Sequence, residues 1–159
     1  MLEATEQVVQ RWPLRVRRRV KWGECDPAGV VYTARFSDYV ISAYELLMRQ
    51  LLDGPLQQIK DRFGFGTPMK ALSLVFSASL RPDEEFDMTV YVAALRNRTF
   101  DIRVDACDLE GRPFFQATLT PITIPRGQRT HSIELPSMLR ERLVHYQERC
   151  KEAAETDRA

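Results

Sequence analysis

The residues with the clearest potential for chemistry lie in one short segment, Gly23-Glu24-Cys25-Asp26-Pro27-Ala28-Gly29-Val30-Val31-Tyr32. Asp26 is the candidate catalytic residue, because a carboxylate just before a helix lies beside unpaired backbone N–H groups and the positive end of the helix dipole. Those N–H groups would stabilise the oxyanion that develops on a bound carbonyl group. Asp26 would then attack the carbonyl itself or activate a water molecule that does so. Gly29 allows a ligand to approach the backbone closely.

A simpler interpretation of Asp26 stays open, since Asp-Pro-x-Gly is also a common turn sequence. The neighbouring Cys25 would point to the opposite face if the strand continues, which favours a buried and inert thiol. The only two histidines, His131 and His145, are far from Asp26 in the sequence and lack metal-ligand spacing. The sequence therefore predicts chemistry that needs no metal and no bound cofactor.

The elements that position Asp26 are an alternating strand and an amphipathic helix. From residue 14 to residue 22, apolar residues alternate with Arg15, Arg17, Arg19 and Lys21, which predicts a strand with one basic, solvated face. The turn at residues 26–29 ends that strand. Apolar residues then recur at three- and four-residue steps, which predicts a helix over residues 33–52 with Thr33 as N-cap and Asp53-Gly54-Pro55 as its end.

The rest of the chain reads mainly as strands. Apolar or alternating runs at 71–80, 88–95, 100–107 and 114–124 predict four strands, with a tight hairpin at 108–111. A charged helix is expected at about 137–155. The predicted fold class is α+β, with a five-stranded antiparallel sheet against one long helix and an extra C-terminal helix. We expect three parts: an N-terminal arm at 1–13, a single domain at 14–136, and a C-terminal helix and tail at 137–159.

Composition excludes several classes of protein. The 159 residues suit one domain, and a formal net charge of +1 gives no reason to expect nucleic acid as a partner. No run of about 18 apolar residues exists, so no membrane span is expected. Three cysteines without paired spacing fit a reducing compartment, and we expect a cytoplasmic protein.

The Asp26 segment, taken from Val20 to Tyr32, resembles the signature of the 4-hydroxybenzoyl-CoA thioesterase family of hot-dog proteins. Two further segments share the resemblance, Gly66-Thr67-Pro68 and Leu95-Arg96-Asn97-Arg98-Thr99-Phe100. The similarity in pattern runs from about residue 16 to about residue 136. It implies a hot-dog fold, in which the sheet wraps around the long helix, and it implies hydrolysis of an acyl-CoA to a free acid and CoA.

The resemblance also implies roles for individual residues. Asp26 matches the family's catalytic carboxylate, and the backbone amide of Thr33 matches the oxyanion-holding amide. Thr67 and Thr99 match polar positions near the acyl group, and Tyr32 is expected to line the same site. A basic pair, Arg96 and Arg98, matches a patch that binds the nucleotide phosphates of CoA, a task that suits the guanidinium fork.

Two positions depart from the family pattern. Thr33 stands where many relatives carry histidine, but a backbone amide survives that replacement. Ile41 stands where the hydroxybenzoyl-specific branch carries a helix carboxylate, and it cannot accept a hydrogen bond from a ring hydroxyl. We therefore expect an apolar substrate-binding pocket at Ile41, and an aromatic or medium-chain acyl group other than 4-hydroxybenzoyl.

Alternatives remain open at this stage. The substrate could be carried by an acyl carrier protein, whose acidic surface would suit the basic strand face. The chain could also be an inactive acyl-CoA-binding module, whereas dehydratase activity is less favoured because no histidine lies near Asp26. Open sheet edges favour a homo-oligomer, and the resemblance implies a tetramer built as a dimer of dimers.

Overall fold

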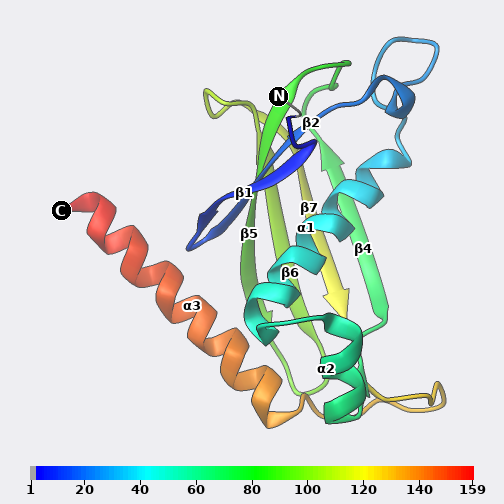
Figure 1. Ribbon diagram of the computed structural model, residues 1–159, viewed down its shortest axis with the longest axis vertical. Helices are drawn as coiled ribbons and strands as arrows, with labels where there is room; N and C mark the ends of the chain where they lie inside the picture. The colour runs from blue at the N-terminus through cyan, green and yellow to red at the C-terminus, as the bar shows by residue number, and fades with distance from the viewer. Residues whose placement is uncertain (1–2) are drawn as a thin grey trace.

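The computed structural model describes residues 3–159 and shows one antiparallel sheet with a long helix across it (Figure 1). The six-stranded sheet has the order β1-β2-β5-β6-β7-β4, and β3 pairs with β8 in a separate two-stranded ladder. The elements are β1 (Glu6–Arg11), β2 (Leu14–Arg19), the short 3-10 helix η1 (Trp22–Glu24), α1 (Arg35–Leu52), α2 (Leu56–Phe63), β3 (Phe65–Gly66), β4 (Met69–Phe76), β5 (Glu85–Leu95), β6 (Phe100–Cys107), β7 (Pro113–Pro121), β8 (Ile124–Pro125) and α3 (Ser137–Arg158).

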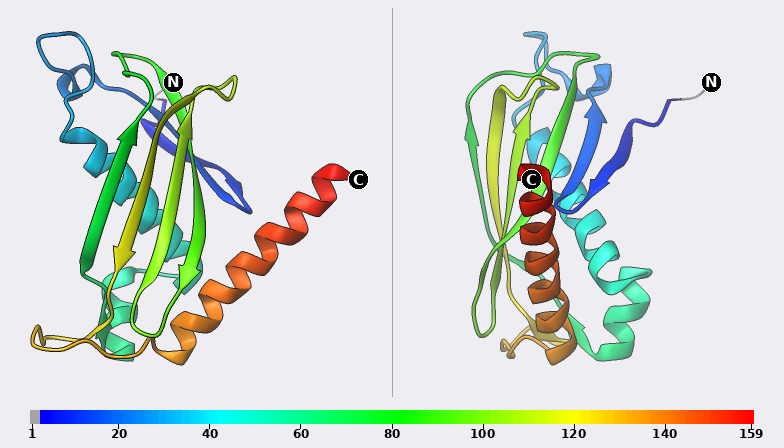
Figure 2. Two further views of the ribbon diagram at one scale, coloured as in Figure 1. Left: turned by 180° about the vertical axis from the view of Figure 1, so that it is seen from behind. Right: turned by 90° about the vertical axis from the view of Figure 1, so that its left-hand side faces the viewer.

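The core lies between the inner face of the sheet and α1, which form two layers in the right-hand view of Figure 2. Alternate residues of β6 and β7 point inward and are buried, as the period of two requires, and in β5 all residues from Phe86 to Val90 are buried. Helix α1 buries nine side chains on one face, beginning with Phe36 and ending with Leu52. This arrangement confirms the predicted α+β class, in which one long helix covers one face of an antiparallel sheet.

The sheet holds a sixth strand that the sequence pattern did not indicate. Residues 6–11 of the expected N-terminal arm form β1, which pairs antiparallel with β2. The prediction of a loose arm was therefore wrong for these residues. The cause is that β1 is held by pairing rather than by burial: Val8 and Val9 are both more than 40% exposed, at 45% and 42%. A register shift between Val8 and Gln10 further obscures the alternation.

The helices also differ from prediction at their ends. Helix α1 starts at Arg35 with Ala34 as its N-cap and no capping side chain, so the prediction of Thr33 as N-cap and first helical residue was wrong. Its predicted end is confirmed, because Asp53 adopts a left-handed conformation (φ 53°) after Leu52. The segment that follows forms the short helix α2, which the sequence did not indicate; it carries no fully buried residue, although Leu56 and Ile59 pack against the core.

Helix α3 packs on the sheet through its first half only. Its buried side chains, Leu139, Leu143 and Tyr146, lie in the first three turns, and the C-terminal half extends away from the sheet (Figures 1 and 2). Trp12, in the turn between β1 and β2, packs against Tyr146 with ring centroids 5.6 Å apart. Within residues 3–159, no helix is both long enough and apolar enough to cross a membrane.

Candidate active site

Asp26 lies in a tight turn that its own side chain helps to close. One carboxylate oxygen, Oδ1, accepts a hydrogen bond from the amide of Ala28 at 2.8 Å. The backbone adds two bonds, from the Asp26 amide to the Val30 carbonyl (2.9 Å) and from the Gly29 amide to the Asp26 carbonyl (3.0 Å). Gly29 has φ +79°, which favours glycine. The turn-forming role is therefore real, and it leaves Oδ2 without a hydrogen-bond donor among residues 3–159.

The start of α1 presents two free amide groups next to this turn. The amide of Arg35 donates to the Tyr32 carbonyl (2.8 Å) and that of Phe36 to the Thr33 carbonyl (3.3 Å). The amides of Thr33 and Ala34 find no acceptor in the described part of the chain. Since unpaired amides at a helix start attract negative charge, both are candidates to hold an oxyanion. Although α1 begins later than predicted, the Thr33 amide is still free to donate to an oxyanion. The Ala34 amide is a second donor that the sequence did not indicate.

A small apolar pocket of about 250 Å³ borders these amides. We call it the Thr33 pocket, and its lining residues are Val30, Val31, Thr33, Phe36, Phe76, Ala78 and Ser79. Its aromatic wall is well packed, because the Phe36 ring lies 4.8 Å from Phe76 and 5.1 Å from Phe115 between centroids. Phe76 is nevertheless 44% exposed, so the pocket opens at the edge of the sheet.

The two residues before Asp26 have different surroundings. Burial, together with the charges of Glu24 and Asp26, raises the pKa of the Cys25 thiol, so it is a poor nucleophile at neutral pH. The Glu24 carboxylate accepts hydrogen bonds from the Tyr39 hydroxyl (2.8 Å), the Lys21 amide (2.9 Å) and Arg18. Glu24 is therefore not a free second base, and Tyr39, 1% exposed, is not placed to contact substrate.

Thr67 and Thr99 lie at the other end of the molecule from Asp26. Thr67 follows α2, and Thr99 bridges to Ile122 beside the β5–β6 turn, at the lower end of Figure 1. The Thr67 hydroxyl is 8% exposed; it accepts a hydrogen bond from Lys60 Nζ (2.7 Å) and lies 3.1 Å from the Tyr44 hydroxyl. Burial lowers the pKa of Lys60, and nearby Arg126 adds to the effect. One chain thus brings Asp26 and Thr33 together but not Thr67 or Thr99.

The remaining predicted contacts are on the surface. Tyr32 is 55% exposed beside the Asp26 turn, and Ile41 is 38% exposed on α1. Arg96 makes a bidentate pair with Asp101, with N–O distances of 2.9 and 2.7 Å. Arg98 donates to the Ser132 carbonyl (2.9 Å) and hydroxyl (3.1 Å) but has no carboxylate partner in residues 3–159. Arg98 therefore carries the less neutralised charge of the basic pair.

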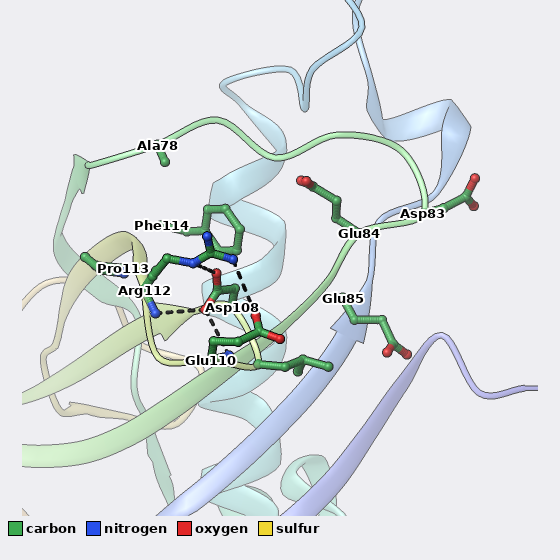
Figure 3. A pocket seen from close by; sticks show the side chains of 10 residues that line it. Ala78, Asp83, Glu84, Glu85, Asp108, Glu110, Arg112, Pro113 and Phe114 are labelled. Atoms are coloured by element: carbon green, nitrogen blue, oxygen red, sulfur yellow. Dashed lines mark hydrogen bonds and ion pairs between the residues drawn. The ribbon is translucent and has the colours of Figure 1, made fainter.

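A second pocket, about 550 Å³, does not suit an anionic ligand. Figure 3 shows that carboxylates surround it, from Asp83, Glu84 and Glu85 on one side and Asp108 and Glu110 on the other. The guanidinium of one arginine, residue 112, is paired with the last two. Ala78 lines both this pocket and the Thr33 pocket, so the acidic wall adjoins the candidate site. Within residues 3–159, no group of three His, Cys, Asp or Glu residues is arranged to hold a metal.

Comparison with known protein families finds one match that covers most of the chain. Residues 20–143 match the family model of the thioesterase-like superfamily. No curated protein sequence matches the chain.

Solved structures show the same fold at low sequence identity. A 1,4-dihydroxy-2-naphthoyl-CoA thioesterase from Synechocystis is 21% identical, with a TM-score of 0.73 over 82% of this chain and 94% of that one. A 4-hydroxybenzoyl-CoA thioesterase mutant complexed with 4-hydroxybenzoyl-CoA is 21% identical, with a TM-score of 0.72 over 81% and 96%. A hypothetical protein from Staphylococcus aureus, in complex with CoA, is 10% identical, with a TM-score of 0.78 over 94% and 89%. These likenesses confirm the predicted hot-dog fold.

Proposed function

Since the chain belongs to the thioesterase-like superfamily and is a thioester hydrolase, we propose that it cleaves an acyl-CoA to a free acid and CoA at the Asp26 turn. The family match supports the resemblance of the Asp26 segment to 4-hydroxybenzoyl-CoA thioesterases. The observation that carries the proposal is local. The Asp26 carboxylate has a free oxygen, its segment is bonded to the segment that leads to the unpaired amides of Thr33 and Ala34, and Thr33 lines an apolar pocket.

In the proposed mechanism, the thioester carbonyl lies with its oxygen toward the amides of Thr33 and Ala34. These amides stabilise the negative charge that develops when the carbonyl carbon becomes tetrahedral. The free Oδ2 of Asp26 attacks the carbonyl carbon to give a mixed anhydride that water hydrolyses, or it removes a proton from a water molecule that attacks directly. The CoA thiolate leaves in either route, and neither route needs a metal or a bound cofactor.

The Thr33 pocket supports an apolar acyl group. Phe36 and Phe76 offer aromatic surface to an aromatic or medium-chain acyl group, and the described pocket offers no carboxylate to a ring hydroxyl. A volume of about 250 Å³ is smaller than the ~300 Å³ at the lower limit of typical ligand sites. CoA must then lie outside the pocket, and we propose that its phosphates bind Arg98 more strongly than Arg96, whose charge is already paired with Asp101.

We propose that the site is completed by a second copy of the chain. Strand β4 is an open edge of the sheet and exposes apolar side chains, with Val75 65%, Phe76 44% and Leu72 37% exposed. Such an edge is prone to pair with another strand. Antiparallel pairing of two β4 strands brings Thr67, which precedes β4 in one chain, toward the Thr33 pocket at the end of β4 in the other. A tetramer formed from two such dimers stays a proposal.

The carrier-protein alternative is less well supported by the basic face of β2. Arg17 makes a bidentate pair with Asp87 (2.8 and 3.0 Å), and Arg19 lies 3.9 Å from Asp83, so half of the four basic residues are partnered. Comparing hydrolysis of one acyl chain on CoA and on acyl carrier protein separates these substrates. A cytoplasmic location also stays a prediction.

The decisive experiment is a hydrolysis screen with purified full-length protein and its Asp26→Asn variant. The asparagine side chain of this variant can keep the bond to the Ala28 amide through its oxygen, so the turn is retained and the loss reports chemistry. We expect aryl- or medium-chain acyl-CoA to be hydrolysed, with kcat reduced on the order of 10²- to 10⁴-fold in the variant. Asp83→Asn, in the neighbouring acidic wall, is the matched control. Wild-type rates in Asp26→Asn would refute the role of Asp26, and tight acyl-CoA binding without turnover by the wild type would identify a binding module.

A further inference from the structure

A partly buried polar cluster adjoins the Asp26 turn in the chain. We call it the Glu24 cluster: the carboxylate of Glu24, the guanidinium of Arg18, the hydroxyl of Tyr39 and the amide of Lys21. Arg18 donates to Glu24, Tyr39 donates to it at 2.8 Å, and the Lys21 amide donates at 2.9 Å. The Arg18 guanidinium also lies over the Tyr39 ring, 4.5 Å from its centroid. Both oxygens of the Glu24 carboxylate therefore have partners: Arg18 on Oε1, and Tyr39 and the amide of its own N-cap residue Lys21 on Oε2.

The cluster joins three elements and both ends of the Asp26 turn. Arg18 belongs to β2, Tyr39 to the second turn of α1, and Glu24 ends η1, two residues before Asp26. The backbone carbonyl of Glu24 also accepts the amide of Tyr32 at 2.9 Å, immediately before Thr33. Glu24 thus links the segment of Asp26 to the segment of Thr33 and Ala34. It also links both segments to β2 and α1.

The other bonds of the turn are internal to it. They run between Asp26, Ala28, Gly29 and Val30, and a bridge pairs Cys25 with Val31. These bonds set the shape of the turn but not its position relative to α1. One further backbone bond, from the Val31 amide to the Leu80 carbonyl (2.8 Å), ties the turn to the segment before β5.

Burial makes the cluster stiff. The side chains of Arg18 and Glu24 are 14% and 13% exposed, and Tyr39 is 1% exposed. Burial alone would raise the pKa of Glu24, but the bonds from the Lys21 amide, Tyr39 and Arg18 outweigh it and lower the pKa. Glu24 is therefore a carboxylate at neutral pH. Charge-assisted hydrogen bonds in such surroundings are strong and directional.

We propose that Glu24 is a positioning residue, which holds the Asp26 carboxylate at the correct distance from the amides of Thr33 and Ala34. The inference rests on the proposed function. It assigns to Glu24 no contact with substrate, because both oxygens of its carboxylate already have partners. A displacement of about 1 Å at a reacting group costs on the order of 10²-fold in rate, so loss of the cluster lowers kcat without removing any catalytic group.

The test compares Glu24→Gln with a matched control carboxylate, Asp87 on β5. Asp87→Asn removes a carboxylate that also forms an arginine pair, with Arg17, the residue before Arg18 on β2. Glutamine keeps one acceptor oxygen but turns an NH₂ group toward donors. We expect kcat to fall about tenfold or more in Glu24→Gln, with KM within about twofold, and both constants to be unchanged in Asp87→Asn. Equal effects of the two variants would overturn the proposal.

A second readout does not depend on activity. The Tyr32 amide, bonded to the Glu24 carbonyl, should exchange its hydrogen at least about tenfold faster in Glu24→Gln and at the wild-type rate in Asp87→Asn. Should Glu24→Gln fail to fold, Tyr39→Phe removes one hydrogen bond and keeps the charge pair; it should lower kcat a few-fold. An unchanged kcat there sinks the inference. If the wild type hydrolyses no thioester, the proposed function is refuted. If hydrolysis depends on Asp26 but is unchanged in Glu24→Gln, only the positioning role is refuted.

Discussion

The phenol of Tyr146 connects α3 to two neighbouring strands, β2 and β5, and its removal is a sharp test of the fold. The Tyr146 hydroxyl accepts a hydrogen bond from the Leu14 amide of β2 and donates one to the Val90 carbonyl of β5, both at 2.7 Å. Leu14 and Val90 are register partners in the β2–β5 ladder. The phenol therefore occupies the place of a direct bond between the strands, and all three residues are at most 1% exposed.

Tyr146→Phe would leave one amide and one carbonyl buried without partners. Each unsatisfied group costs about 1–3 kcal/mol, so the pair predicts a loss of about 2–6 kcal/mol in the free energy of unfolding. The phenylalanine ring keeps the packing against Trp12, so little of the loss comes from apolar contacts.

Urea unfolding followed by circular dichroism measures this loss. With a slope of about 2 kcal/mol per molar urea, the midpoint should fall by roughly 1–3 M with the slope unchanged. The control is Tyr91→Phe, next to Val90 on β5, whose hydroxyl has no hydrogen bond within residues 3–159; its effect should stay within about 0.5 kcal/mol. A loss below about 1 kcal/mol in Tyr146→Phe would refute the reasoning, because the Leu14 amide and the Val90 carbonyl would then find partners without the phenol. The predicted loss would make α3 part of one cooperative domain rather than an appended tail.

Three further predictions address assembly, CoA binding and pH. Val75→Lys places a charge on the open β4 edge. In light scattering, the mass of the assembly should fall by half or to that of the 18.4 kDa chain. An unchanged mass would exclude β4 as the interface. Arg98→Ala should raise KM for acyl-CoA several-fold with kcat unchanged in steady-state kinetics. Arg96→Ala should raise KM less, because Asp101 already neutralises Arg96. A larger increase in KM for Arg96→Ala than for Arg98→Ala would contradict the assignment. The pKa of Glu24 is lower in the fold than its ordinary value of 4.5, so the Glu24 carboxylate stabilises the fold above that pH and loses this contribution as the pH falls through the lowered pKa. The difference in unfolding free energy between wild type and Glu24→Gln should therefore disappear in acid. A difference that stays constant with pH would argue against this role.

Segments with one buried face were predictable from the sequence. The predicted bounds 100–107 are those of β6, and α1 ends at residue 52 as expected, because burial imposes the period of two or of 3.6 on the residues themselves. Strand β1 was missed because it has no buried face, and helix α2 because its eight residues are too few to establish a period of 3.6. Pairing with β2 creates β1, and α2 contains no buried residue.

The candidate site was predictable in part for the same physical reason. The position of Asp26 follows from local turn and helix signals, and these lie within a few residues of each other. The partners of Glu24 do not follow, because Arg18 and Tyr39 meet it only when β2 and α1 fold together. Polar residues at 18 and 39 on otherwise apolar faces were the available signal. The Ala34 amide depends on where α1 begins, which is the least certain part of any helix in a sequence.

The separation of Asp26 from Thr67 leads to a test of the whole proposal. The Thr67 hydroxyl lies beside the Tyr44 hydroxyl, and Tyr44 is nine residues after Arg35, so about 14 Å of helix separates it from the start of α1. No side chain spans that distance, and both residues serve one acyl group only if two chains contribute. Asp26→Asn and Thr67→Val should then each lower activity alone, yet equal mixing after reversible dissociation should restore about a quarter of the intact sites, because half of the dimers are mixed and each has one intact site. If the two impaired variants exchange subunits but mixing restores no activity, Thr67 acts within its own chain, through Lys60 and Tyr44. The acyl group would then be bound at the Asp26 end alone.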